Sequence, residues 1–459
     1  MNPIHFHGVL GVATKKIANY ALFLCATALF CQSSVAAIPI QQWTLANGAK
    51  VYLVESPAIA MLDVQIDFDA GSRRVPPDKA GLAGETASLL SQGIAARGAF
   101  PMLDENALGE AWADLGAQFG SSAGADRMSF SLRTLTEPEL LDKAVALAAR
   151  QIGEPSFPDS IWQRDRQKSV ARLKESYTRP SSVAGRAYAK AVYGQHPYGF
   201  EATEATLTNI SVADMQAFYA AGVVACRARI SMVGAVTRAQ ADAIAQRLLA
   251  RLPQVSCNSL PAPPAVAEVA PLLAAKQIVI PFDAAQAQVL IGQPGYKRSD
   301  PAFFPLLVGN YILGGGGFVS RLSNEVREKR GLTYSVSSNF SPGLHAGAFT
   351  VGLQTRPDQA AQALEVTRKV LRDFVADGPT NAELKAAKDN LIGGFALLID
   401  SNRKLLGNIS NIAWNDLPLD YLDTWTHQVG KVTVQDIKSA FTQKLQPDKM
   451  VTLVLGAIP

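Results

Sequence analysis

Apolar and polar residues alternate most clearly just after residue 60. In LDVQIDFDAG, every second residue from Leu62 to Phe68 is apolar, and this period of two is typical of a strand with one buried face. Immediately before it, WTLANGAKVYLVE places Asn47-Gly48 between two apolar runs, which predicts a β-hairpin. The folded part of the chain is therefore expected to begin with strands.

The segment AGLAGETASLLSQG, residues 80–93, is predicted to be a helix that follows this strand. Its leucines lie on the side that faces the core. Gly84, Ala87 and Ser88 occupy positions i, i+3 and i+4, so they share another face. None of these three side chains is suited to bind a metal ion or to transfer a proton. The sequence thus places a chemically inert face beside a core strand.

The second half of the chain repeats features of the first. ISVADMQAFY (210–219) resembles VTVQDIKSAF (432–441), and both begin with a predicted capping box. Each is followed by a strand that ends in Gly-Ala, and the same 20-residue spacing separates Asp214 from Gly234 and Asp436 from Gly456. These features indicate an internal duplication of an α+β unit of ~200 residues. A chance agreement between two helix caps is the alternative.

A proline-rich segment without periodicity separates the two halves. A chain of 459 residues is expected to form two or three domains. We predict an N-terminal domain at 38–253, a linker at 254–272 that is semi-rigid where proline dominates, and a C-terminal domain at 273–459. The expected fold class is α+β, with strands and helices in both halves.

The first 37 residues have the order of a secretory signal peptide. Lys15-Lys16 precede an apolar run from Tyr20 to Cys31, and Val35-Ala36-Ala37 forms a small-residue cleavage site. A membrane anchor is the alternative, but the run is shorter than the ~20 residues that a spanning helix needs. We therefore expect an exported, periplasmic protein without stable membrane insertion. A net charge of +4 gives no strong attraction to nucleic acid.

The cysteines and histidines outside the signal peptide form no recognisable zinc motif. Cys226 and Cys257 could form a disulfide after export or remain two buried thiols, and they form no zinc motif. The remaining histidines, His196, His345 and His427, are far apart, so no local two-histidine zinc motif exists. The Walker phosphate loop is absent as well.

The segment LGGGGFVSRLSNEVREKRGLTYSVSSNF, residues 313–340, is the richest in functional side chains. Four glycines open it and leave backbone amides accessible to another chain: Gly314, Gly315, Gly316 and Gly317. A short helix, a stop at Gly331 and a strand then carry Arg327 and Tyr334 near a turn. A fixed cation and a phenol suit a carbonyl oxygen that gains charge. The alternative is a solvated basic helix end beside a core tyrosine.

From about residue 40 to its end, the chain resembles the insulinase/pitrilysin family of zinc metallopeptidases, which includes the mitochondrial processing peptidase. The resemblance includes the Asn-Gly hairpin, the strand end Asp69-Ala-Gly-Ser72, Gly81-Leu-Ala83 and His196-Pro-Tyr-Gly199. GGGG…SRL…REKRGLTYSV is its most specific part. It implies two homologous domains, each a mainly antiparallel sheet packed against helices. In the family, an Arg and a Tyr seven residues apart bind substrate, and Arg327 and Tyr334 match them.

The family's zinc-binding positions hold other residues here. In active members Gly-Leu-Ala is followed by His-x-x-Glu-His, in which the histidines bind zinc and the glutamate activates water. These positions are Gly84, Ala87 and Ser88, and a third ligand, a glutamate on a later helix, aligns with Arg172. We therefore expect no metal in this chain, with Arg172 placing positive charge in the emptied site. Glu85 lies one residue off that face and is expected to be a surface carboxylate.

Some active assemblies of this family divide the two sets of residues between two chains. The resemblance implies a non-catalytic, substrate-binding subunit of a heterodimeric periplasmic zinc metalloendopeptidase, with zinc in a homologous partner. Arg327 and Tyr334 would hold the peptide substrate. The loop Gly314–Gly317 and an edge strand within GAQFGSSAGADRMSFS would bind its backbone by strand addition. The alternative is a peptide-binding or scaffolding protein without a role in proteolysis, and catalysis by an unrecognised site is a third possibility.

Overall fold

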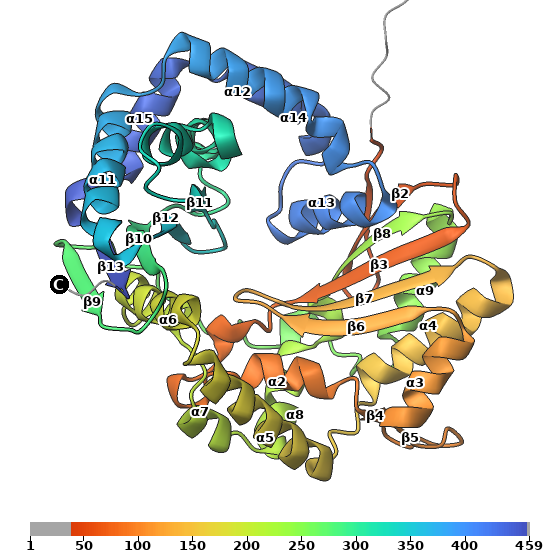
Figure 1. Cartoon of the computed structure of the whole chain (residues 1–459). Coiled ribbons are helices and arrows are strands. Elements are labelled where there is room, and N and C mark those ends of the chain that lie inside the picture. Colours follow the sequence, from red (N-terminus) through yellow and green to blue (C-terminus); the bar gives the residue numbers. More distant parts are fainter. Residues whose placement is uncertain (1–37, 457–459) are drawn as a thin grey trace, which may run out of the picture. The chain divides into compact units, whose positions relative to one another are not determined.

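Two mixed sheets organise the protein, whose computed structural model describes residues 38–456 (Figure 1). The strand order of the first sheet is β1-β2-β8-β3-β7-β6. Its strands are β1 (Gln41–Thr44), β2 (Lys50–Glu55), β3 (Met61–Phe68), β6 (Gln118–Ala123), β7 (Met128–Leu135) and β8 (Arg229–Gly234). The order of the second sheet is β11-β12-β10-β13-β9. Its strands are β9 (Lys276–Ile280), β10 (Ala287–Pro294), β11 (Val336–Phe340), β12 (Ala348–Thr355) and β13 (Val451–Leu455).

Helices follow the strands in a similar succession in both halves, although α3 and α9 of the first half have no α-helical counterpart among the described residues of the second. The helices before the linker are α2 (Leu82–Leu89), α3 (Glu105–Asp114), α4 (Pro138–Gly153), α5 (Asp159–Ser176), α6 (Pro180–Tyr193), α7 (Glu204–Thr208), α8 (Val212–Gly222) and α9 (Arg238–Leu249). Those after it are α10 (Phe303–Asn310), α11 (Ala360–Asp377), α12 (Asn381–Gly393), α13 (Asn402–Trp414), α14 (Tyr421–Lys431) and α15 (Val434–Lys444). A two-stranded sheet joins β4 (Gly93–Ile94) to β5 (Leu103–Asp104).

The predicted α+β class is confirmed, with sheets that are mostly antiparallel. The predicted signal peptide, residues 1–37, lies outside the described residues. Within residues 38–456, no helix has both the length and the apolar character that crossing a bilayer requires. The domain limits at residues 253 and 273 stay a proposal.

The two sheets have matching topology. Strands β2, β8, β3, β7 and β6 lie in the same order as β9, β13, β10, β12 and β11. The first pair is parallel in each sheet, and the following pairs are antiparallel. The predicted capping boxes are present, because Ser211 and Asp214 cap α8 while Thr433 and Asp436 cap α15. The match supports the internal duplication.

Each half lends one helix to the sheet of the other half. Helix α13 packs on β3 and β8 of the first sheet, whereas α6 packs on β10 and β13 of the second (Figure 1). By their place in the succession of elements, α6 and α13 are equivalent helices of the duplicated unit. The exchange therefore ties the two halves together through equivalent surfaces.

A buried carboxylate fixes α13 to the first sheet. Asp67 of β3 is fully buried and accepts hydrogen bonds from Arg127 Nη1 at 2.9 Å and from Ser410 Oγ of α13 at 2.8 Å. Ser129 Oγ also donates to Asp67, at 2.5 Å, and Gln65 Nε2 donates to Ser410 Oγ at 2.7 Å. A buried charge is tolerated only when its oxygens are paired in this way.

Helix α6 is fixed to the second sheet by two tyrosines. Tyr188 Oη donates to the carbonyl of Phe349 at 3.0 Å, and the amide of Ala348 donates to Tyr193 Oη at 2.8 Å. The helix approaches so closely that a Cβ at Gly292 would lie 2.1 Å from Tyr188 Oη. The same Cβ would lie 1.9 Å from the carbonyl oxygen of Phe349 in β12, so both the neighbouring strand and α6 require glycine at this position of β10.

The proline-rich segment is tethered to the first sheet. Cys226 and Cys257 form a disulfide, a pairing that the sequence left open. Arg227 Nη2 donates to the carbonyl of Pro261 at 2.5 Å, and Arg74 donates to the carbonyl of Pro264. Proline has no amide hydrogen, so its carbonyl is the backbone group that a neighbouring side chain can hold. One covalent bond and two arginines thus position residues 257–264.

We expect Arg127→Met to destabilise the fold by about 3 kcal/mol, because it leaves the Asp67 carboxylate buried without its counter-ion. Chemical and thermal denaturation followed by circular dichroism would measure the effect. Lys385→Met is the matched control, since Lys385 pairs with Asp389 on the exposed surface of α12 and such pairs contribute less than about 1 kcal/mol. Equal effects of the two substitutions would contradict this role of Asp67.

Candidate functional site

Helix α2 carries the inert face that the sequence singles out. Ser121 Oγ of the edge strand β6 donates to the carbonyl of Ala87 at 2.7 Å, which fixes the helix beside the edge of the first sheet. Ala87 is buried, whereas Gly84 and Ser88 are exposed. A Cβ at Gly84 would meet no atom within 4 Å. Packing therefore does not require glycine there, and the surface has room for a larger side chain.

Helix α5 supplies polar groups opposite α2. Glu85 is partly buried and its carboxyl is hydrogen bonded to Ser169. Arg172 is exposed, and its Nη2 lies 3.4 Å from Ser169 Oγ. The expectation that Glu85 is a plain surface carboxylate is wrong, because its side of α2 faces α5. Burial raises the pKa of Glu85 above its ordinary value of 4.5, although the Ser169 hydrogen bond and the Arg172 charge oppose that rise.

The structure thus brings the predicted Arg172 close to α2. Arg172 shares Ser169 as a hydrogen-bonding partner with Glu85, the neighbour of Gly84. Among the described residues, no group of three His, Cys, Asp or Glu side chains is arranged to hold a metal ion. Between α2 and α5 lie instead the carboxylate of Glu85, the hydroxyl of Ser169 and the guanidinium of Arg172. Whether these positions correspond to the family's zinc ligands stays a prediction.

Arg327 and Tyr334 lie together, as the sequence predicts. Arg327 belongs to a π-helical turn (Ser323–Glu328), and Tyr334 lies in the bend between Gly331 and β11. The guanidinium carbon of Arg327 is 5.0 Å from the centroid of the Tyr334 ring. Tyr334 is 80% exposed, which rules out the alternative of a core tyrosine. A cation and a phenol are therefore presented together at the surface.

Phe318 completes this cluster and was missed by the sequence analysis. Its ring centroid lies 4.4 Å from the guanidinium carbon of Arg327, so the cation contacts the rings of both Phe318 and Tyr334. Such cation–π contacts orient a guanidinium without neutralising it. Phe318 is 67% exposed and Val319 is 78% exposed. The available signal was an aromatic residue directly after four glycines.

Different structural constraints require glycine at different positions of the loop Gly314–Gly317. A Cβ at Gly314 would lie 2.5 Å from the amide of Ser338 in β11, and one at Gly316 would lie 2.7 Å from a carbonyl oxygen. Gly317 has a φ of +62°, which favours glycine. Gly315 and Gly317 are exposed, whereas Gly314 is buried. Only part of the loop therefore offers its backbone to another chain.

The two groups of predicted residues belong to different sheets. Gly84, Ala87, Ser88 and Arg172 lie on helices beside the first sheet, where β6 forms one edge. Tyr334 directly precedes β11, which forms the corresponding edge of the second sheet. No hydrogen bond or ion pair among residues 38–456 links the two groups. The predicted edge strand within residues 116–131 is confirmed as β6.

Comparison with known proteins identifies the family. Residues 209–391 match the family model described as the peptidase M16 inactive domain. A crystal structure of a peptidase M16 inactive domain from Pseudomonas fluorescens is 34% identical and aligns with a TM-score of 0.84, over 92% of this chain and 98% of that one. The chain belongs to the peptidase M16 family. The insulinase/pitrilysin-like resemblance is thereby confirmed.

Two curated relatives of this M16 chain have contrasting descriptions. An uncharacterized zinc protease of Bacillus subtilis is 22% identical over 90% of this chain and 98% of the relative. A protein of Helicobacter pylori described as a non-peptidase homolog is 25% identical over 85% of this chain and 88% of the relative. The M16 fold thus includes relatives of both descriptions.

We expect Glu85→Gln to raise the midpoint of thermal unfolding near neutral pH. Because the pKa of Glu85 is higher in the folded state than in the unfolded state, ionisation of this carboxyl costs more in the folded protein. The cost is absent below about pH 4 and complete above the raised pKa, so the advantage of the variant should disappear on acidification. Glu110→Gln, on the exposed surface of α3, is the control. A variant advantage that is independent of pH would contradict the assignment.

We expect metal analysis of the purified chain to find far less than one zinc ion per molecule. The side chains at positions 84, 87 and 88 offer no imidazole or carboxylate, and zinc sites in proteins are built from such groups and thiolates. Inductively coupled plasma mass spectrometry after dialysis against zinc measures the occupancy. Stoichiometric zinc that survives dialysis would contradict the interpretation of α2.

Proposed function

We propose that this M16 chain is the non-catalytic, substrate-binding subunit of a heterodimeric zinc metalloendopeptidase. A homologous partner with an intact His-x-x-Glu-His motif would supply the zinc, which activates water for peptide hydrolysis. This chain would supply Arg327, Tyr334 and the glycine loop. The signal-like residues 1–37 support export of the protein to the periplasm.

The observation that carries the proposal is the exposed Arg327–Tyr334 pair. The two residues come from a helical turn and from the bend before β11, so both sides of the pair are held by regular structure. Among residues 38–456, Arg327 has one acidic neighbour within 4 Å, Glu328, whose Oε1 lies 3.5 Å from Nε. The guanidinium thus keeps hydrogen-bond donors for a peptide carbonyl, and the Tyr334 hydroxyl adds another.

Edge strands offer a way to bind the peptide backbone. Strand β6 pairs with β7 on one side, and its side chains from Gly120 to Ala123 are small. An extended peptide binds such an edge through backbone hydrogen bonds, largely independently of its sequence. An unstructured peptide is therefore the substrate class that the features support.

Activity on an unstructured peptide, measured for this chain and a zinc-bearing M16 partner, alone and mixed, tests the proposal. Cleavage is expected to require the mixture. Arg327→Ala should lower kcat/KM of the mixture by about 100-fold, as should Tyr334→Phe, because each removes a donor to the scissile carbonyl. Zinc content of the partner should stay unchanged in both cases.

Arg330→Ala is the matched control for this experiment. Arg330 is exposed, lies on the same segment and pairs with Glu325 instead of contacting the rings. We expect this variant to retain nearly full activity in the mixture. Full activity of the Arg327 and Tyr334 variants would favour the alternative, a peptide-binding or scaffolding protein without a role in proteolysis.

A further inference from the structure

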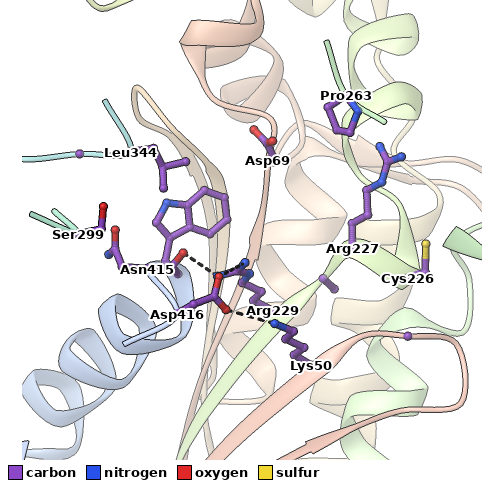
Figure 2. A pocket seen from close by; sticks show the side chains of 14 residues that line it. Lys50, Asp69, Cys226, Arg227, Arg229, Pro263, Ser299, Leu344, Asn415 and Asp416 are labelled. Atoms are coloured by element: carbon purple, nitrogen blue, oxygen red, sulfur yellow. Dashed lines mark hydrogen bonds and ion pairs between the residues drawn. The ribbon is translucent and has the colours of Figure 1, made fainter. Parts of the chain in front are cut away.

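A cavity of about 520 Å³ lies where the two halves and the linker meet (Figure 2). The first half contributes Lys50, Arg227 and Arg229 to its wall, and the linker contributes Pro263. Residues from two loops and from the end of α13 form the opposite side: Ser299, Gly343, Leu344, Trp414, Asn415 and Asp416. Its volume falls in the range of about 300–1,000 Å³ that is typical of small-molecule sites.

Two carboxylates on the wall are already neutralised. Asp416 lies 2.9 Å from Arg229 and 3.2 Å from Lys50, as the dashed lines in Figure 2 show. Asp69 lies 2.5 Å from both Arg73 and Arg74. Burial raises the pKa of both carboxyls, but their cationic partners, Arg229 and Lys50 for Asp416 and two arginines for Asp69, outweigh it and hold each pKa below its ordinary value. Both groups are therefore ionised, and each is matched by two cations.

Arg227 is the cation that remains without a counter-ion. Its Nη2 donates to the neutral carbonyl of Pro261, and it makes no ion pair within the described part of the chain. Figure 2 shows its side chain extending toward Pro263, away from the Asp416 cluster. An unpaired guanidinium on the wall of a cavity favours a carboxylate ligand, because its planar donors match two carboxylate oxygens.

The other side chains that line the cavity can contact an apolar group of a ligand. Pro263, Leu344 and Trp414 are the large apolar side chains among the residues that line it. Trp414 is held in place by Arg127 and Arg229, whose guanidinium carbons each lie 5.5 Å from its ring. Asp416 adopts a left-handed backbone conformation, with φ at 47°, just where α13 ends. The cavity therefore has an aromatic side at Trp414, which suits an apolar group, and a cationic side at Arg227, which suits an anion.

We propose that this cavity binds a small carboxylate that carries an apolar group. The carboxylate contacts Arg227, and the apolar group packs on Trp414 and Leu344. Two sources share this chemistry, namely the C-terminal residue of a peptide and a free organic acid. The site is separate from Arg327 and Tyr334, so it stands or falls independently of the proposed peptidase role.

Binding of N-acetyl-phenylalanine and of its carboxamide to the mature chain, measured by isothermal titration calorimetry, tests the proposal. The acid should bind at least about tenfold more tightly than the amide, because only the acid pairs with Arg227. 3-Phenylpropionate distinguishes the two sources: weaker binding than N-acetyl-phenylalanine points to a peptide C-terminus, and equal binding points to an organic acid. Bound acid should also raise the midpoint of thermal unfolding.

Substitutions of Arg227 distinguish a role in ligand binding from the structural role of its hydrogen bond to Pro261. Arg227→Gln should bring the acid-to-amide affinity ratio close to one, whereas Arg227→Lys keeps the charge and should preserve most of that ratio. Arg238→Gln, on the exposed surface of α9, is the control and should leave the ratio unchanged. The proposal is wrong if the acid shows no saturable binding, if the wild-type ratio is near one, or if Arg227→Gln leaves the ratio intact.

Discussion

The exchange of α6 and α13 between the two sheets is the constraint on which the rest of the structure depends. Each helix covers one face of the sheet formed by the other half, so separation of the halves would expose a face of both sheets. The polar contacts at the two interfaces differ, with a buried carboxylate under α13 and two tyrosines along α6. At both interfaces, separation of the two halves would break these hydrogen bonds and leave buried polar groups without partners, which is unfavourable.

Helix α2 has a structural role within the first half, where it contacts α8 and β6. The helix lies beside the edge of the first sheet and packs through buried residues such as Leu82 and Leu89, a role that is independent of metal binding. Gly84 and Ser88 on its outer face are exposed, and Glu85 is hydrogen bonded to Ser169 of α5. The exposed cation and phenol of Arg327 and Tyr334 lie instead beside the equivalent edge of the second sheet.

Local patterns in the sequence predicted much of this arrangement. The hairpin at Asn47-Gly48 and both capping boxes depend on neighbouring residues, so they could be found from the chain alone. The helix exchange could not, because the surfaces of α6 and α13 show apolar faces without showing which sheet they meet. The contacts of Phe318 with Arg327 and the side of α2 that Glu85 occupies depend on packing across elements. The disulfide likewise required the distance between Cys226 and Cys257.

The central claim is that Tyr334 lies against the peptide while the partner's zinc site cleaves it. Photo-crosslinking from p-benzoylphenylalanine at position 334, in the presence of a zinc-bearing partner and an unstructured peptide, tests it most directly. The same probe at Tyr177, an exposed tyrosine next to α5, is the reference. The account predicts a peptide adduct at position 334 that depends on the partner, with little adduct at position 177. Absence of a peptide adduct at 334, or equal adducts at both positions, would contradict it.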